Sequence, residues 1–172
     1  GLDIDNEATR NRKIADYFYD GTTFPFNDNE YDSVLCNQVL EHVFNPDKFL
    51  SEIKRVLKPE GRLLLTIPFV WDEHEQPQDY ARYSSFGLKA LLDKNGFNVI
   101  GYKKIGTDVS TIFQLINAYL YKIFVKCPLP IRVVITMTLM SSFNLLGIIL
   151  GMLLPRNPDL FLDQIVLAEK IN

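Results

Sequence analysis

The stretch that decides the fold reads Tyr31-Asp-Ser-Val-Leu-Cys36, then Asn37-Gln-Val-Leu-Glu-His-Val43 and, after a helical pattern, Arg62-Leu-Leu-Leu-Thr-Ile-Pro-Phe69. The first and last blocks are nearly continuous apolar runs, which is typical of parallel strands covered on both faces. Between them, apolar residues recur at three- and four-residue spacing, which predicts a helix with one buried face. The stretch therefore predicts a strand, helix, strand unit with a right-handed crossover.

The predicted helix has clear start and stop signals. Asn45-Pro46-Asp47 offers a capping side chain, a proline suited to the first turn and a carboxylate at the positive end of the helix dipole. Pro59-Glu60-Gly61 is expected to end the helix. The apolar face consists of Phe49, Leu50, Ile53, Val56 and Leu57. Because the carboxyl ends of parallel strands open onto one edge of the sheet, residues 37–42 and 68–83 should line a site.

The order of these blocks resembles the class I S-adenosylmethionine-dependent methyltransferases, in particular the methyltransferase type 11 domain. Residues 31–43 and 49–68 are similar to the fourth and fifth strand region of that family, and an ordered series of blocks is more specific than one motif. The resemblance covers residues 1–105. It implies an α/β fold with a three-layer Rossmann-like sheet, S-adenosyl-L-methionine as the cofactor, and methyltransferase activity.

The resemblance also implies cofactor-binding residues at two strand ends. Asp3, with Ile4 beside it, matches the carboxylate that accepts hydrogen bonds from both ribose hydroxyls, and a carboxylate offers the two acceptors that a diol needs. Asp20-Gly21-Thr22 matches the turn whose acidic residue accepts a hydrogen bond from the adenine amino group. Two alternatives remain open. Asp3 and Asp5 could cap a helix over residues 7–13, and Asp20-Gly21 could be an ordinary turn.

Three polar residues follow the strand that ends at Cys36. Asn37 and Gln38 lie at the predicted ligand edge, where their amides could bind the cofactor or orient a substrate. His42 could be a general base. We favour a structural role in which its ring hydrogen-bonds a backbone carbonyl and shapes the loop.

The segment from Phe69 to Tyr83 is the predicted substrate loop, because it leaves a strand at the ligand edge and is dense in ionisable and aromatic groups. It resembles the His-Glu-x-Pro-x-Asp-Tyr-x-Arg-Tyr segment of a methyltransferase subgroup that includes members encoded with cell-surface polysaccharide genes. We predict that His74 takes a proton from a hydroxyl or amine nucleophile. Asp79 and Arg82 could instead form a salt bridge that holds the loop. The predicted substrate-contacting residues are Trp71, His74, Tyr80 and Arg82, and no metal site is predicted.

The later elements predict an interrupted core. Ser84-Ser85 should cap a helix that Asn95-Gly96 ends, and Phe97–Tyr102 should be a strand. Phe161–Lys170 fits an antiparallel last strand of the resembling family. We therefore predict a methyltransferase core over residues 1–106, from its second strand onward, an apolar helical pair inserted over residues 107–158, and the final strand over residues 159–172.

The predicted insertion is strongly apolar. Residues 109–125 form a helix candidate, Pro128-Leu129-Pro130 interrupts it, and residues 133–154 include no charged side chain. A run of this length could cross a bilayer. The flanking strands must join one sheet, so the chain has to return to the side it left. Residues 109–154 are thus predicted to make peripheral membrane contact or a homodimer interface, with a true crossing ranked below both.

Composition narrows the class of protein. The chain of 172 residues has 47% hydrophobic residues and a net charge of −3, which suits one packed domain and excludes a basic nucleic-acid footprint. Its two cysteines lie in different predicted elements, and no secretory signal opens the sequence. We expect reduced thiols in a cytoplasmic protein, at the inner face of a membrane if the insertion binds lipid.

The family's first strand, with its glycine-rich turn, does not precede Gly1. We therefore expect that an upstream portion is missing and that this chain alone binds the cofactor weakly. The predicted function is methyl transfer to an oxygen or nitrogen nucleophile of a small-molecule or glycan-type substrate. The alternative is a degenerate methyltransferase-fold module that lost the cofactor and serves in membrane or protein docking.

Overall fold

A computed structural model describes residues 1–5, 9–10 and 15–171. The chain forms two compact units. The first comprises residues 1–67, 78–102 and 165–172, and the second comprises residues 68–77 and 103–164. The second unit contains the predicted insertion over residues 107–158 and also takes in residues 68–77.

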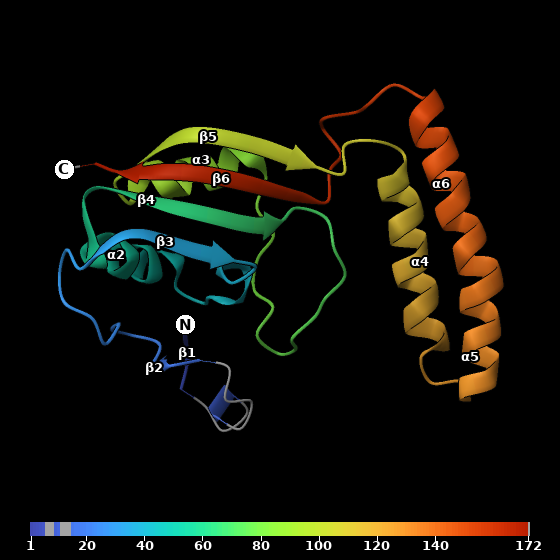
Figure 1. Cartoon of the computed structure of the whole chain (residues 1–172), viewed down its shortest axis with the longest axis horizontal. Coiled ribbons are helices and arrows are strands. Elements are labelled where there is room, and N and C mark those ends of the chain that lie inside the picture. Colours follow the sequence, from blue (N-terminus) through green and yellow to red (C-terminus); the bar gives the residue numbers. More distant parts are fainter. Residues whose placement is uncertain (6–8, 11–14, 172) are drawn as a thin grey trace. The chain divides into compact units, whose positions relative to one another are not determined.

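The largest sheet has four strands in the order β3 (Tyr31–Asn37), β4 (Leu57–Pro68), β6 (Asp163–Lys170) and β5 (Phe97–Ile105) (Figure 1). β3 and β4 are parallel, which confirms the predicted strand, helix, strand unit. β6 runs antiparallel to β5, because the Leu162 amide donates to the Ile105 carbonyl and the Ile171 amide donates to the Gly96 carbonyl, both at 2.9 Å. The predicted α/β sheet with an antiparallel last strand is therefore confirmed.

Two helices pack on this sheet and begin with the predicted caps. In α2 (Pro46–Val56), the Asn45 side chain accepts from the Lys48 amide at 3.2 Å. In α3 (Ser85–Lys94), Ser84 Oγ accepts from the Gly87 amide at 3.1 Å. A short 3-10 helix, η1 (Leu40–His42), follows β3. The fully buried apolar residues of these helices and strands, which form the core, include Leu40, Leu50, Leu63, Leu65, Leu88, Leu92 and Phe97.

The end of α2 differs from the prediction. The helix stops at Val56, and Leu57 already belongs to β4 with extended backbone angles. Tyr31 pairs with Leu57 and Ser33 pairs with Arg62, so the residues between Leu57 and Arg62 bulge out of the ladder. Pro59 disfavours helical geometry at the residue before it, which explains why the helix does not continue to the Pro-Glu-Gly signal.

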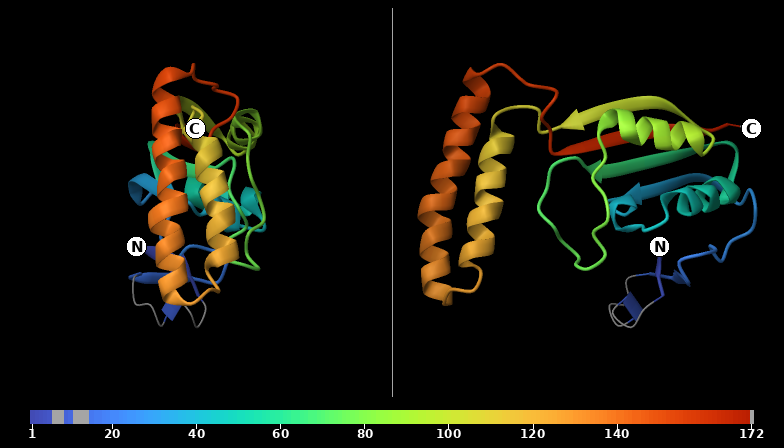
Figure 2. Two further views of the ribbon diagram at one scale, coloured as in Figure 1. Left: turned by 90° about the vertical axis from the view of Figure 1, so that its right-hand side faces the viewer. Right: turned by 180° about the vertical axis from the view of Figure 1, so that it is seen from behind.

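Both α2 and α3 cover the same face of the sheet (Figure 2). The right-handed crossovers from β3 to β4 and from β4 to β5 advance in one direction, which places both helices on one side. On the other face, Leu35 is 68% exposed and Leu64 is 40% exposed. The prediction that both faces of these strands are covered is therefore wrong within the described residues.

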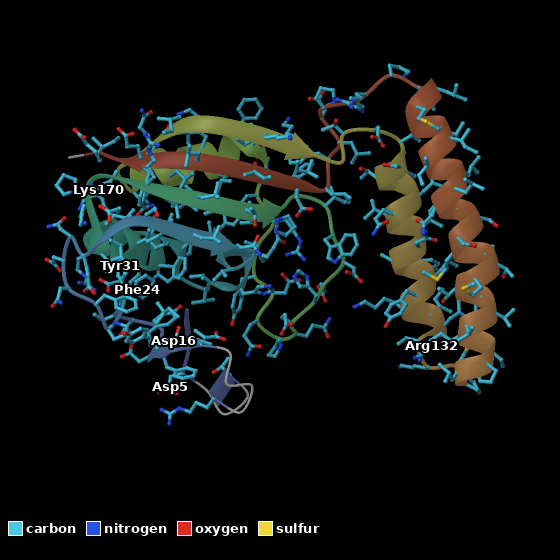
Figure 3. All side chains as sticks on the ribbon, viewed as in Figure 1. Asp5, Asp16, Phe24, Tyr31, Arg132 and Lys170 are labelled. Atoms are coloured by element: carbon cyan, nitrogen blue, oxygen red, sulfur yellow. The ribbon has the colours of Figure 1, made fainter. Side chains whose placement is uncertain are left out.

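A separate two-stranded parallel sheet is formed by β1 (Leu2–Ile4) and β2 (Tyr17–Tyr19). Edge-to-face ring contacts join it to the core, from Tyr19 to Phe24 at 5.1 Å and from Phe24, which Figure 3 labels, to Phe49 of α2 at 5.6 Å. Among the described residues, β1 pairs only with β2 and β3 pairs only with β4. Each of these strands therefore keeps one edge without a neighbouring strand in this part of the chain. The expected helix over residues 7–13 lies mostly outside the described residues.

The second unit is dominated by a helical hairpin. Its first arm is α4 (Ser110–Phe124). Its second arm is a continuous helix made of α5 (Leu129–Ile135), a π-helical turn, η2 (Thr136–Met140), and α6 (Ser141–Leu153). The predicted helical pair with a break at Pro128-Leu129-Pro130 is confirmed.

Candidate cofactor and substrate site

The carboxyl ends of β1 and β2 bring four predicted cofactor residues together. The two strands are adjacent and parallel, with Asp3 beside Phe18 and Ile4 beside Tyr19. Asp20 follows directly after β2. A Cβ built on Gly21 would lie 3.8 Å from Ile4 Cδ1, so the turn after β2 lies against the end of β1. This geometry places Asp3, Ile4, Asp20 and Gly21 in one small region.

Tyr19 links this region to the end of β3. Burial is the main cause that raises the pKa of the Tyr19 hydroxyl, and electrostatic interactions with Cys36, Asp3 and Asp20 raise it further. Asp3 and Asp20 belong to the same pair of strand ends as Tyr19. Cys36 is the residue before Asn37 at the end of β3.

Asp20 organises its own turn. Its Oδ1 accepts from the Thr22 amide at 2.8 Å, the Thr22 hydroxyl at 2.5 Å and the Thr23 amide at 3.1 Å, while Gly21 has a φ of +83°. Hydrogen bonding from the Thr22 hydroxyl is the main cause that lowers the pKa of this exposed carboxyl group. The ordinary-turn alternative thus describes the local geometry correctly. Asp20 nevertheless remains an exposed anion at a strand end, as the cofactor hypothesis requires.

Thr66 positions both amide side chains that follow β3, and sequence reasoning missed it. The Thr66 hydroxyl donates to Asn37 Oδ1 at 2.5 Å and accepts from Gln38 Nε2 at 3.3 Å. It also accepts from the Gln38 amide at 3.2 Å, and Gln38 adopts a φ of +52°. The available signal was a single hydroxyl inside the apolar run of β4, in register with Asn37.

The polar turn after β3 holds the following loop in place. His42 Nδ1 lies 2.7 Å from the Gln78 carbonyl oxygen, which confirms its predicted structural role. The Glu41 carbonyl accepts from the amides of Tyr80 at 2.9 Å and Ala81 at 3.2 Å. The side chain of Glu41 is fully buried, a role that sequence reasoning also missed. Burial, followed by the charge of Glu41, raises the pKa of the Cys36 thiol to about 12.

Asp79 and Arg82 form the alternative salt bridge of the loop. Arg82 Nη1 and Nη2 donate to the two carboxylate oxygens of Asp79 at 2.5 and 2.7 Å, and the Asp79 side chain is 5% exposed. A bidentate pair of this kind fixes the orientation of both groups. Substrate contact by Arg82 remains a prediction.

The other predicted substrate residues are divided between the two units. Tyr80 belongs to the first unit, where its ring contacts Phe44 edge to face at 5.4 Å. Trp71 and His74 belong to the second, where His74 Nδ1 lies 3.2 Å from the Asp72 carbonyl oxygen. In that unit Lys122 also binds Asp72 through an ion pair of 3.2 Å. Substrate contact by Trp71 and Tyr80, and the roles of His74 as substrate contact and as base, stay predictions.

Comparisons with known proteins agree with this fold. The family model described as a methyltransferase domain matches residues 1–65. An uncharacterised protein of Methanocaldococcus jannaschii is 30% identical over 128 residues, which are 68% of this chain and 61% of that protein. The ubiquinone/menaquinone biosynthesis C-methyltransferase of Ruegeria sp. is 32% identical over 81 residues, which are 47% of this chain and 28% of that enzyme.

A solved structure is similar over almost the whole chain. It is phosphoethanolamine N-methyltransferase 2 of Haemonchus contortus in complex with S-adenosyl-L-methionine, with a TM-score of 0.53 and 18% identity. The match covers 96% of this chain and 40% of that one. The fold is that of the class I S-adenosylmethionine-dependent methyltransferases, and the sequence is similar to their methyltransferase domain over residues 1–65. The chain spans less than two thirds of the length of either sequence relative.

The residues at the three strand ends fit the nucleoside half of the family's cofactor. Asp3 and Asp20 lie at the adjacent ends of β1 and β2, and an amide held by Thr66 follows β3. These groups suit a ribose diol and an exocyclic amine, which both donate hydrogen bonds. The described residues include no glycine-rich turn at the open edges of β1 and β3.

Proposed function

We propose that the protein transfers the methyl group of S-adenosyl-L-methionine to a small-molecule acceptor. The observation that supports this most directly is the meeting of Asp3, Ile4, Asp20 and Gly21 at the adjacent carboxyl ends of β1 and β2. The cofactor supplies an electrophilic methyl group on a sulfonium. The protein's task is to hold both reactants in line for displacement, because positioning alone can supply much of the rate enhancement.

Each candidate residue has a distinct task in this proposal. Asp3 would accept from the ribose hydroxyls, with Ile4 against the nucleoside, and Asp20 in the Gly21-Thr22 turn would accept from the adenine amino group. Asn37 and Gln38, oriented by Thr66, would shape the side from which the methyl group leaves. His74 would accept the proton of an oxygen or nitrogen nucleophile, which balances the charge as the new bond forms. Trp71, Tyr80 and Arg82 would border the acceptor.

The acceptor class is the finer part of the proposal. We favour an oxygen or nitrogen nucleophile on a small or glycan-type molecule, because an imidazole, an arginine and two aromatic rings follow β4. The name of the Ruegeria relative indicates a carbon acceptor for that enzyme. A carbon acceptor would still require a base, so the identity of the methylated atom has to be measured.

The test is methyl transfer from labelled S-adenosyl-L-methionine by the protein expressed from its complete reading frame. Acceptors should include a hydroxylated glycan, an amine and a quinol, with the product atom located by mass spectrometry. We expect His74→Gln to lower turnover by about 10²-fold or more, as the loss of a general base typically does, with little change in cofactor affinity. Undiminished turnover by His74→Gln would remove the base from the proposal. Tight cofactor binding without transfer to any acceptor class would favour a docking module.

A further inference from the structure

The second arm of the helical hairpin presents an unusually apolar surface. Residues Leu129–Leu153 form one helix of 25 residues with a mean hydropathy of 2.0, and only 6% of its most apolar window is buried. Among the described helices it alone is long and apolar enough to cross a membrane by length and composition. A core helix of similar composition would be mostly covered by protein. The exposed large apolar residues of α6 are Leu145, Leu146, Ile148, Ile149, Met152 and Leu153.

The polar side chains within this run bond to their own helix or to its partner in the hairpin. Thr138 Oγ1 donates to the Val134 carbonyl at 2.7 Å, Ser141 Oγ to Met137 at 2.6 Å and Ser142 Oγ to Thr138 at 2.7 Å. Asn144 Oδ1 accepts from Asn117 of α4 at 2.7 Å. Hydroxyl groups bonded in this way need no water, so they are compatible with an apolar solvent.

The contact between the two arms has the composition of a helix interface in lipid. Gly147 faces α4, and a Cβ built there would lie 3.0 Å from Phe113 Cβ, so the two backbones approach closely. Gly151, four residues on, faces the Asp108 carboxylate before α4, whose Oδ1 would lie 3.3 Å from a Cβ built there. Small residues four apart together with an interhelical amide hydrogen bond are the features that hold helices together where no hydrophobic effect acts between them.

Within the hairpin sequence, between Asp108 and Asp159, the charged side chains are all basic. From Val109 to Pro158 the sequence has four basic residues, Lys122, Lys126, Arg132 and Arg156, and no acidic one. Lys126 and Arg132 flank the turn between the arms, where Figure 3 labels Arg132. Cations near an apolar surface are attracted to anionic headgroups.

We propose that the hairpin docks the protein on an anionic lipid bilayer, with the exposed surface of α5, η2 and α6 embedded in one leaflet. Both arms connect to strands of the same sheet, since α4 follows β5 and α6 precedes β6. The chain therefore enters and leaves the bilayer on one side. The cations at the turn stay at headgroup level, so the hairpin lies along the surface.

Vesicle flotation of the 172-residue chain tests this proposal. The vesicles are phosphatidylcholine alone and phosphatidylcholine mixed with phosphatidylglycerol. Wild type should float with the mixed vesicles. Leu145→Glu combined with Met152→Glu should reduce partitioning at least about tenfold, because two apolar side chains would be replaced by charges in the acyl region. The matched control is Phe86→Glu, which changes an 83% exposed apolar residue on α3 and should float like wild type.

Two further measurements separate lipid from the other occupants. Lys126→Glu with Arg132→Glu should abolish the preference for phosphatidylglycerol, and circular dichroism should show that every variant keeps its helix content. Equal flotation of wild type and the variant with Leu145→Glu and Met152→Glu would overturn the proposal. Light scattering without vesicles would detect a dimer of the wild-type chain. If Leu145→Glu with Met152→Glu converts that dimer to a monomer, and wild type does not float with either kind of vesicle, the surface binds a second copy of the chain.

Discussion

At the scale of single residues, Thr66 illustrates how one hydroxyl can organise a strand end. It binds Asn37 and Gln38, and it holds Gln38 in a left-handed conformation beside β4. We expect Thr66→Val to lower the free energy of unfolding by about 1–2 kcal/mol, because the amides lose a partly buried partner. Urea denaturation measures this change. Thr66→Ser keeps the hydroxyl and is the control, so equal stability of the Val and Ser variants would contradict the assigned role.

At the scale of elements, Arg55 joins α2 to the segment before β3. Its guanidinium donates to Glu52 at 2.9 and 2.7 Å, to Asp28 at 2.8 Å, and to the carbonyls of Phe24 and Phe26 at 3.0 and 2.8 Å. We expect Arg55→Ala to lower the free energy of unfolding by about 2 kcal/mol at pH 7. This value allows for the partial exposure of Arg55 and Glu52. Lys58→Ala, which breaks the exposed pair with Asp32, is the control and should change stability much less than Arg55→Ala does.

The ion pair between Arg55 and Glu52 should make the free energy of unfolding depend on pH. The hydrogen bond from Arg55 is the main cause that lowers the pKa of Glu52 in the folded state. A lowered folded pKa stabilises the fold above the unfolded value, near 4.5, and this stabilisation is lost as the pH falls through the folded value. The difference in unfolding free energy between wild type and Arg55→Ala should therefore shrink below about pH 4. A difference that stays constant from pH 7 to pH 3 would show that Glu52 is not the partner that matters.

The hairpin depends on close packing at Gly147. A leucine there would collide with Phe113, whose Cβ lies 3.0 Å from the position of a new Cβ. We expect Gly147→Leu to destabilise the hairpin by about 1–3 kcal/mol, seen as faster proteolysis within residues 107–158. Phe113→Ala should partly rescue Gly147→Ala, because it removes the ring atoms that lie 3.2 Å from the new Cβ and leaves only the Phe113 Cβ in contact. The matched control is Gly87→Ala, where the nearest atom is the Ser84 hydroxyl at 3.3 Å. Failure of the rescue would show that the arms do not pack through this pair.

At the scale of the whole molecule, the sequence predicts the features that depend on local signals. Asn45 and Ser84 cap their helices, Gly96 takes a φ of +77° after α3, and the apolar blocks become β3 and β4. Features decided by distant pairing could not be predicted in this way. The end of α2 at Val56 depends on Leu57 pairing with Tyr31, and the role of Thr66 depends on its register with Asn37.

The sequence was also ambiguous where one residue type suits two roles. Asp20 both closes a turn and presents a carboxylate, and Arg82 could bind a substrate or Asp79. The prediction that both faces of β3 and β4 are covered was wrong for a different reason. Continuous apolar strands indicate burial, but Leu35 and Leu64 show that the direction of the crossovers decides which face receives the helices.

The central claim is that Asp3, Asp20 and Asn37 form one nucleoside site. The most direct test is calorimetric titration of S-adenosylhomocysteine into the protein expressed from its complete reading frame, comparing wild type, Asp3→Ala and Asp5→Ala. Asp5 is the matched control, because it is a neighbouring carboxylate paired with Arg10. We predict that Asp3→Ala weakens binding by about 10- to 100-fold, as expected for charged hydrogen bonds, and that Asp5→Ala binds like wild type. Unchanged affinity in Asp3→Ala, in a protein whose wild type binds tightly, would contradict the claim.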